Sequence, residues 1–541
     1  LFFCFLIRSI QLKSILPKQS SSSKRIPIFF LPQVGESSPH SFHKHINQKD
    51  ALMLTSTCIT GDLTPYTPSL SKPWDKVRAQ HLYRRIGFGA TPDELDAALD
   101  LDPAALVDQL IDEAINLPDL PRPEWADWKG SQFRDLDDNI QKLYEYLIDW
   151  SVALPQRGLR EKLTLFWSGH FVTQFESYTC SVMGYRYLEI LRDHALGNFR
   201  TMTEAIGKTP AMLFYLNGAD NTQEAPNENY ARELFELFTL GRDNGYTQQD
   251  IVETSRALTG WTIAYDQATA QEGDWCTKDE QFYPYRFDNG VKTIFGQTGN
   301  WGYDDVHDIL FSQRSQKIAA YICGLLYQEF VSHQIDTVIV GQLANTFLSN
   351  NFEIAPVLRQ LFKSEHFFDD GVIHTQVKNP YFLTSSLLKE MGMPIDQAIK
   401  GYVFGAPEIM GQVILNPPDV AGWSGDRDWI NTTTLTMRWE IVQGFTAYYA
   451  DKYALQLVNF AKKVSGNSND AAAVTQALVD FFIPRGLQTP EAYERATKVF
   501  QGEIPQNYFD DGTWSLDFDG AQWQIFLLMQ HIARLPEFQL V

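Results

Sequence analysis

The chain has 541 residues, 44% hydrophobic and 21% charged, with 45 Lys and Arg against 66 Asp and Glu for a formal net charge of −21. This composition is typical of a globular protein and excludes a disordered or fibrous one. The excess of acid argues against duplex nucleic acid and against an anionic membrane surface as partners, because both are bound by clustered Lys and Arg.

Residues 1–52 differ from the rest of the chain in charge. They carry seven Lys and Arg against two acidic residues, a net charge of +5, whereas residues 53–541 carry 38 basic and 64 acidic residues, a net charge of −26. The sign changes at Met53, the first methionine. We expect residues 1–52 to be upstream sequence and the functional protein to begin near Met53. The alternative is a targeting segment, but its apolar residues precede the charge, so no secretory signal is recognised and the compartment stays open.

From Trp74 onward, apolar residues recur three and four positions apart, which predicts a mainly α-helical protein. Thr91-Pro92-Asp93-Glu94 combines an N-cap, a proline at the first helical position and a capping-box acid, and it predicts a short helix. No run of 18 apolar residues exists, so no transmembrane helix is expected. The other expected helices are 74–86, 103–116, 135–153, 157–168, 181–195, 227–240, 248–258, 314–331, 334–350, 353–363, 376–391, 430–448 and 471–482.

One stretch, 261–303, is rich in Trp, Tyr, Phe, Gly and Asp and interrupts the helical pattern. Within it, 283–287 and 291–295 flank Asp288-Asn289-Gly290, which suits a tight turn. We expect a small β-hairpin inserted into a helical body that spans 53–541, with a less distinctive C-terminal helical part over about 440–541. Long insertions are often functional, so this one, which begins at Trp261, is a candidate wall of a site.

The cysteines and the common catalytic motifs give little guidance. Five cysteines are scattered and never spaced as CxxC, so neither a disulfide framework nor a cysteine zinc site is predicted. The dinucleotide loop, the phosphate-binding P-loop, HExxH and GxSxG are also absent. The common nucleotide-binding and serine-hydrolase architectures are therefore not expected.

The strongest constellation of polar residues lies in the segment Ala225–Gly241, within which a helix is expected over 227–240. Glu228, Arg232 and Glu236 are each four apart, so one guanidinium can pair with both carboxylates on a solvated face. Oxygen atoms at the start of the helix would also suit a hard cation or a sugar hydroxyl, and a buried polar network is a third interpretation. The candidate catalytic residues here are Glu228 and Glu233, and the candidate binding residues are Asn227, Asn229 and Arg232.

Two histidines lie in patterns that admit a functional role. His170 falls at helical spacing from apolar residues, which favours a hydrogen-bonded core histidine, with acid–base or metal chemistry as the alternative. Asp304, Asp305 and His307 cluster after the insertion and are candidate ligands of a divalent metal. Acidic residues are also favoured in the first turn of a helix by its dipole, which is the simpler interpretation.

A loop over 416–432 contains Trp423 and Trp429 beside two glycines, with Asn431 near the start of the next helix. An aromatic surface in a polar loop can stack on a sugar ring or a partner protein, and packing of the loop onto the helical body is the alternative. Trp261, Trp423, Trp429 and Asn431 are candidate binding residues.

Six segments give the chain a resemblance to the large bacterial domain-of-unknown-function 1800 family, from about Ala79 to Arg438 and more weakly to Phe538. They are His81–Leu95, Glu161–Phe171, Ala225–Leu234, Ala257–Trp261, Lys292–Gly296 and Pro417–Trp423. The resemblance implies a mostly helical fold and no established activity. It also implies that relatives are often exported and that their genes often lie beside one for a sulfatase-like protein. Asp419 stands where the family commonly has Asn, so no role is carried over to that position.

Two hypotheses of function follow. In the first, the Asn227–Glu236 helix, His170 and the Asp304–His307 cluster line one acidic cleft that binds a divalent metal and hydrolyses a polysaccharide or similar envelope material. In the second, the protein is a non-catalytic binding or assembly protein that acts with a sulfatase-like partner through the insertion and the tryptophan loop. The sequence leaves both open.

Overall fold

The structure is a computed structural model that describes residues 59–265, 271 and 273–541. The expected boundary near Met53 lies outside these residues. In the described part of the chain, no helix is both long and apolar enough to cross a membrane.

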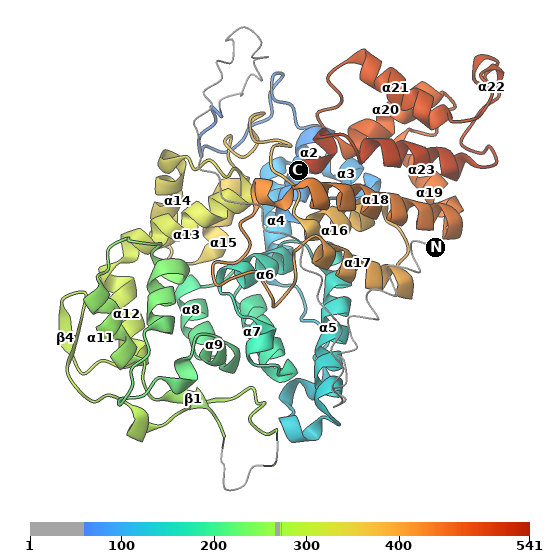
Figure 1. Ribbon diagram of the computed structural model, residues 1–541. Coiled ribbons are helices and arrows are strands. Elements are labelled where there is room, and N and C mark those ends of the chain that lie inside the picture. The colour runs from blue at the N-terminus through green and yellow to red at the C-terminus, as the bar shows by residue number, and fades with distance from the viewer. Residues whose placement is uncertain (1–58, 266–270, 272) are drawn as a thin grey trace, which may run out of the picture. The chain divides into compact units, whose positions relative to one another are not determined.

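The fold is mainly α-helical, as the apolar periodicity predicts (Figure 1). The helices of the N-terminal half are α2 (Lys76–Ile86), α3 (Pro92–Ala98), α4 (Pro103–Ile115), α5 (Leu136–Arg157), α6 (Leu159–His170), α7 (Ser181–Asp193), α8 (Phe199–Gly207), α9 (Pro210–Tyr215), α10 (Asn229–Glu233) and α11 (Gln248–Ala257). Those that follow are α12 (Tyr303–Gln313), α13 (Ser315–Phe330), α14 (Thr337–Ser349), α15 (Ile354–Phe362), α16 (Pro380–Met391), α17 (Gln397–Ile409), α18 (Thr432–Lys452), α19 (Ala454–Val464), α20 (Ala471–Phe482), α21 (Pro490–Gln501), α22 (Asn507–Asp510) and α23 (Ala521–Ile532).

Local capping chemistry explains why many of these helices begin where they do. In α3, the backbone N–H of Glu94 donates to the Thr91 hydroxyl at 3.3 Å, and the Glu94 carboxylate accepts from the Thr91 N–H at 2.7 Å. This is the predicted capping box. Asn198 caps α8 and Thr209 caps α9, two helices that the periodicity does not predict because each is too short to show several apolar repeats.

The C-terminal helices pack mainly on one another. α18 lies against α23, and α21 packs on both α20 and α23 (Figure 1). They are joined to α2 by hydrogen bonds, since Arg84 donates to the carbonyls of Phe481 and Phe482 at 3.1 and 3.4 Å. The same guanidinium forms a two-pronged contact with Glu390 of α16 at 2.6 and 3.2 Å.

The inserted segment contains two small antiparallel sheets instead of the one expected hairpin. β1 (Trp261–Ile263) pairs with β2 (Glu280–Phe282), and β3 (Lys292–Ile294) pairs with β4 (Gln297–Gly299). The prediction that 283–287 pairs with 291–295 is wrong.

The reason for the different pairing lies in the turns. Phe295 and Gly296 have φ of 50° and 81°, the positive values that a two-residue hairpin turn requires at both central positions. Burial of Phe295 against Phe235 compensates for this conformation, with the ring centroids 5.1 Å apart. The expected turn residue Asp288 instead accepts from the N–H of Gly290 at 2.7 Å and pairs with Arg256 of α11.

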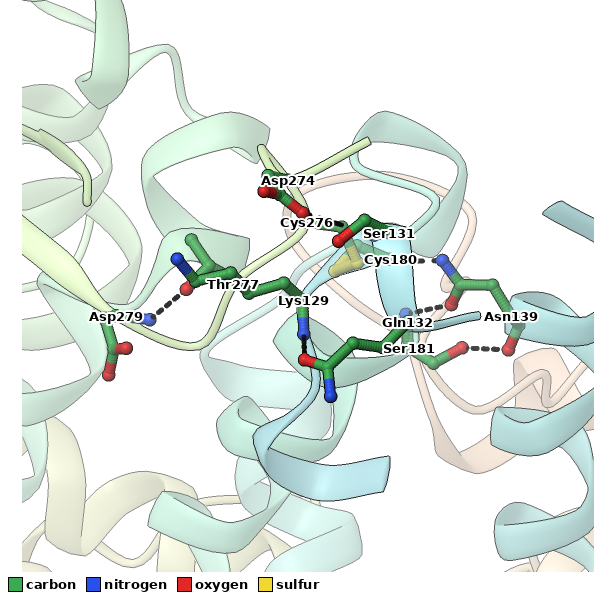
Figure 2. The surroundings of a disulfide bond; sticks show 10 residues. All are labelled: Lys129, Ser131, Gln132, Asn139, Cys180, Ser181, Asp274, Cys276, Thr277 and Asp279. Atoms are coloured by element: carbon green, nitrogen blue, oxygen red, sulfur yellow. Dashed lines mark hydrogen bonds between the residues drawn. A yellow bond between two sulfur atoms is a disulfide. The ribbon is translucent and has the colours of Figure 1, made fainter. Parts of the chain in front are cut away.

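A second correction concerns the cysteines, for which the sequence predicted no disulfide framework. Cys180 and Cys276 form one, with their Cα atoms 5.4 Å apart, and they lie 96 positions apart in the chain (Figure 2). Their spacing carries no local signal, because the inserted segment folds back onto the start of α7 and only this return brings the two thiols together.

Candidate functional site

A cavity of about 310 Å³ lies where α6, α13 and the tryptophan loop (416–431) meet. Its volume is at the lower end of the range found for small-molecule sites. The charged and aromatic side chains that line it include Arg85, Lys162, His170, Glu329, Trp423, Asp426 and Trp429. Two of the sequence-predicted features, His170 and the tryptophan pair, thus border one space.

The tryptophan loop reaches the cavity because two glycines allow the backbones to touch. A side chain at Gly422, which has φ of 84°, would overlap the carbonyl of Gly169 at the end of α6. A side chain at Gly169 would in turn come within 3.0 Å of the Trp423 ring. The indole Nε1 of Trp423 is buried and has no hydrogen-bond partner among the described residues. Asn431, by contrast, caps α18 by accepting from the N–H groups of Thr433 and Thr434 at 2.9 Å.

His170 presents a neutral imidazole to the cavity. Its Nε2 lies 3.0 Å from the carbonyl oxygen of Phe238 and must donate to it, which leaves Nδ1 as the acceptor. Burial lowers the pKa of His170 to about 4, an effect that this hydrogen bond opposes. The carbonyl belongs to a π-helical turn, η5 (Leu234–Thr239), which continues α10. Such turns are frequent at functional sites.

Two buried cations and a carboxylate lie on another side of the cavity. The Lys162 ammonium donates to the carbonyls of Arg84, Arg85 and Gly87 at 3.1, 2.7 and 3.2 Å, so all its protons are used in closing the end of α2. Burial lowers the pKa of Lys162 to about 8 and that of Arg85 to about 9, and the charge of Glu329 opposes both shifts. No hydrogen bond or ion pair joins the Glu329 carboxylate to another described residue, which leaves it available to a ligand.

The polar face of the predicted acidic helix lies outside the cavity. Arg232 pairs with Glu228 at 2.9 Å and with Glu236 at 3.5 Å, and the side chains of Arg232 and Glu228 are more than a third exposed. Asn227 and Asn229 shape the turn that starts the helix, since the Asn227 side chain accepts from the Asn229 N–H at 2.9 Å. This geometry matches a salt-bridged solvated face.

Glu233 of the same helix has no ion-pair partner in the described part of the chain, and burial and the neighbouring Glu236 raise its pKa. It does not line the cavity, which receives only Leu237 from this stretch.

The side chains of Asp304, Asp305 and His307 lie in three different environments and do not converge on one site. Asp304 is 88% exposed, Asp305 accepts from the Gly302 N–H at 2.9 Å as a helix cap, and His307 is fully buried with Nδ1 2.9 Å from the Tyr303 carbonyl. No group of three or more His, Cys, Asp or Glu side chains among the described residues could hold a metal ion. Trp261 likewise lies apart from the cavity, with the Lys208 ammonium 5.2 Å from its ring centre.

The sequence patterns missed the charged residues of the cavity. Glu329 stands in an apolar part of α13, directly before Phe330, and an isolated carboxylate in such a helix is the signal that would have found it. Lys162 of α6 directly follows Arg160 and Glu161, so it has no such isolated signal. Asp426 follows Gly425 in the tryptophan loop and gives no comparable local signal.

A family described as "Protein of unknown function (DUF1800)" matches residues 81–540. The chain belongs to this family. No curated protein and no solved structure matches the chain. Apart from Val541, all residues that line the cavity fall within the region matched to DUF1800. The description of DUF1800 assigns no activity.

Proposed function

We propose that the protein binds a saccharide in the cavity beside Trp423 and Trp429. The observation that carries this proposal is that both indole rings border the same space as two carboxylates, Glu329 and Asp426, which form no hydrogen bond or ion pair with another described residue. A polysaccharide or similar envelope material is the class of ligand that we expect.

The chemistry of the lining supports this choice. Indole rings offer flat apolar faces that fit the C–H faces of a sugar ring, and Trp and Tyr commonly combine such a face with a polar tip. The carboxylates of Glu329 and Asp426 accept hydrogen bonds from sugar hydroxyls. The lining exposes more polar than apolar surface, which suits a ligand that is rich in hydroxyl groups.

Hydrolysis of the bound saccharide is the second candidate function. Glu329 and Asp426 favour it, because glycoside hydrolysis generally uses two carboxyl groups, one to protonate the leaving oxygen and one to activate water or attack the sugar. The neutral His170 beside them holds an acceptor nitrogen at its Nδ1. We propose Glu329 as the catalytic carboxylate in this case.

Binding is tested by isothermal titration calorimetry with peptidoglycan fragments, uronic-acid oligomers and neutral glucans. We expect at least one to bind with a Kd below about 1 mM, and Trp423→Ala to weaken it at least about tenfold, or ~1.4 kcal/mol. The matched control is Trp275→Ala, which removes a 37% exposed indole outside the cavity and should leave the Kd unchanged. Absence of binding by the whole panel, or equal loss in both variants, would contradict the proposal.

Hydrolysis is tested by measuring the release of reducing ends from the ligand that binds. Glu329→Gln should reduce the rate at least about a hundredfold, the usual scale of general acid–base catalysis, while binding persists. Glu228→Gln removes a carboxylate outside the cavity and should leave the rate unchanged. Binding without any release of reducing ends would leave the protein a saccharide-binding protein and eliminate the second candidate.

A further inference from the structure

The disulfide lies inside the contact between the inserted segment and the helical body. Cys180 is the residue that precedes α7, and Cys276 lies between β1 and β2. Their side chains are 0% and 1% exposed. Figure 2 shows the bond with Asn139 and Ser181 on one side and Thr277 and Asp279 on the other. The bond therefore joins two parts of the fold at their buried contact.

Few hydrogen bonds join residues 273–279 to the helical body, and the Trp275 ring packs on Phe214 of α9 with the ring centroids 6.2 Å apart. The Gly130 N–H donates to the Cys276 carbonyl at 3.0 Å, and the Ser131 N–H donates to the Asp274 carboxylate at 3.3 Å. An ion pair between Lys278 and Asp127 is 34% and 56% exposed, so it contributes little. β1 and β2 both belong to the inserted segment, so their pairing does not attach this segment to α7. The disulfide is thus the main buried connection of 273–279 to the body.

The third described cysteine does not compete for this bond. Cys323 is fully buried in α13, and burial raises the pKa of its thiol, which keeps it protonated and unreactive. Asn139 links the residue after Cys180 to Cys276. Its carboxamide accepts from the Ser181 N–H at 2.9 Å and donates to the Cys276 sulfur at 3.6 Å. Cys180 is therefore placed for one partner.

We infer that the Cys180–Cys276 disulfide is a redox latch that holds residues 273–279 against the start of α7, and that its reduction releases this stretch. When the latch closes, two thiols lose two protons and two electrons, and the disulfide of a thiol oxidant takes them up and becomes two thiols. A dithiol reverses the exchange when local opening of the segment exposes the two sulfur atoms, which are buried in the closed state. Because cytosolic thiol pools keep such cysteines reduced, the closed latch belongs to an oxidising compartment. No described residue of 261–303 lines the cavity, so opening the latch leaves saccharide binding intact.

The closed state is tested on protein purified from its native host with free thiols blocked during lysis. Trypsin cuts after Lys162, Arg186, Arg256 and Lys278, so the bond links peptide 163–186 to peptide 257–278. Mass spectrometry without reductant should detect this pair. Recovery of both peptides with blocked free thiols would overturn the inference.

Opening is tested by hydrogen exchange of the folded full chain with and without a phosphine reductant. We expect amide exchange at Gly130 and across 273–279 to become at least about tenfold faster on reduction, because the Gly130 N–H loses its acceptor on Cys276, while α14 stays unchanged. Cys180→Ala, Cys276→Ala and the double variant should exchange equally fast, since each removes the same bond. Cys323→Ala is the control and should exchange like the native protein. Equal exchange at 273–279 with and without reductant would overturn the latch.

Discussion

Burial decides what a charged residue does in this protein. Glu161 is fully buried and accepts from Arg157 and Arg192 at 3.0 Å and from the Trp150 indole N–H at 2.6 Å. These partners lower the pKa of Glu161 against the effect of burial. Glu228 makes a similar contact with Arg232 at 2.9 Å, but both side chains are in water. The sequence shows both as charged residues four positions from an arginine.

We expect this difference to appear in stability. Glu161→Ala leaves Arg192 as a buried charge without a counterion and should lower the free energy of unfolding by about 3–5 kcal/mol. Glu228→Ala breaks an exposed pair and should cost less than about 1 kcal/mol. Urea unfolding of both variants measures the two costs. Equal costs would show that Glu161 is not held as an ion in the folded protein.

Local sequence patterns also identified only some of the residues of the candidate site. The sequence pointed to His170, Trp423 and Trp429 because an apolar stripe and a glycine-rich aromatic loop are visible in local patterns, and these residues do line one cavity. Glu329 was not predicted, although an isolated carboxylate in apolar α13 is a local signal, because its place in the cavity depends on the approach of the tryptophan loop to α13, which no spacing encodes.

At the scale of elements, helices were more predictable than strands. Apolar periodicity and caps such as Thr91 identified most long helices, since these signals act within a few residues. The β3–β4 pairing was missed because its turn places Phe295, a residue without turn preference, at positive φ, and burial against Phe235 is what compensates.

Two glycines should respond in opposite directions to alanine. Gly296 has φ of 81°, so Gly296→Ala should cost about 1–2 kcal/mol of stability even though no atom lies within 4 Å of the added methyl group. Gly341 lies inside α14 with equally open space, so Gly341→Ala should stabilise by about 0.5–1 kcal/mol. Thermal unfolding of the two variants tests this. A stabilising effect at Gly296 would contradict the assigned turn.

At the scale of the whole molecule, several histidines are enclosed in neutral form. Burial lowers the pKa of His170 to about 4, and burial with the charges of Arg84 and Lys378 lowers that of His374 to about 2. His81 is shifted in the same direction by burial and by Arg85. Unfolding exposes these rings, whose ordinary pKa is near 6.5.

This predicts how stability depends on pH. Below about pH 6.5 the unfolded chain binds protons that the folded chain excludes, so the free energy of unfolding is fully retained above that pH and falls as the pH decreases toward 4. Each such histidine contributes up to about 1.4 kcal/mol per pH unit. His374→Gln should reduce the slope between pH 6.5 and 5, because it removes the imidazole whose pKa is lowered in the folded protein. Urea unfolding at these pH values measures the slope, and a flat profile would contradict neutral burial.

The sequence by itself determined the helical class, most helix starts, the acidic charge and the family, because each depends on composition or on residues a few positions apart. Only the tertiary structure decided the cavity, the disulfide and the position of the inserted segment. These join residues that are distant along the chain, such as His170 with Trp423 and Cys180 with Cys276. Such contacts depend on packing of complete helices and loops, and packing leaves no periodic trace in the sequence.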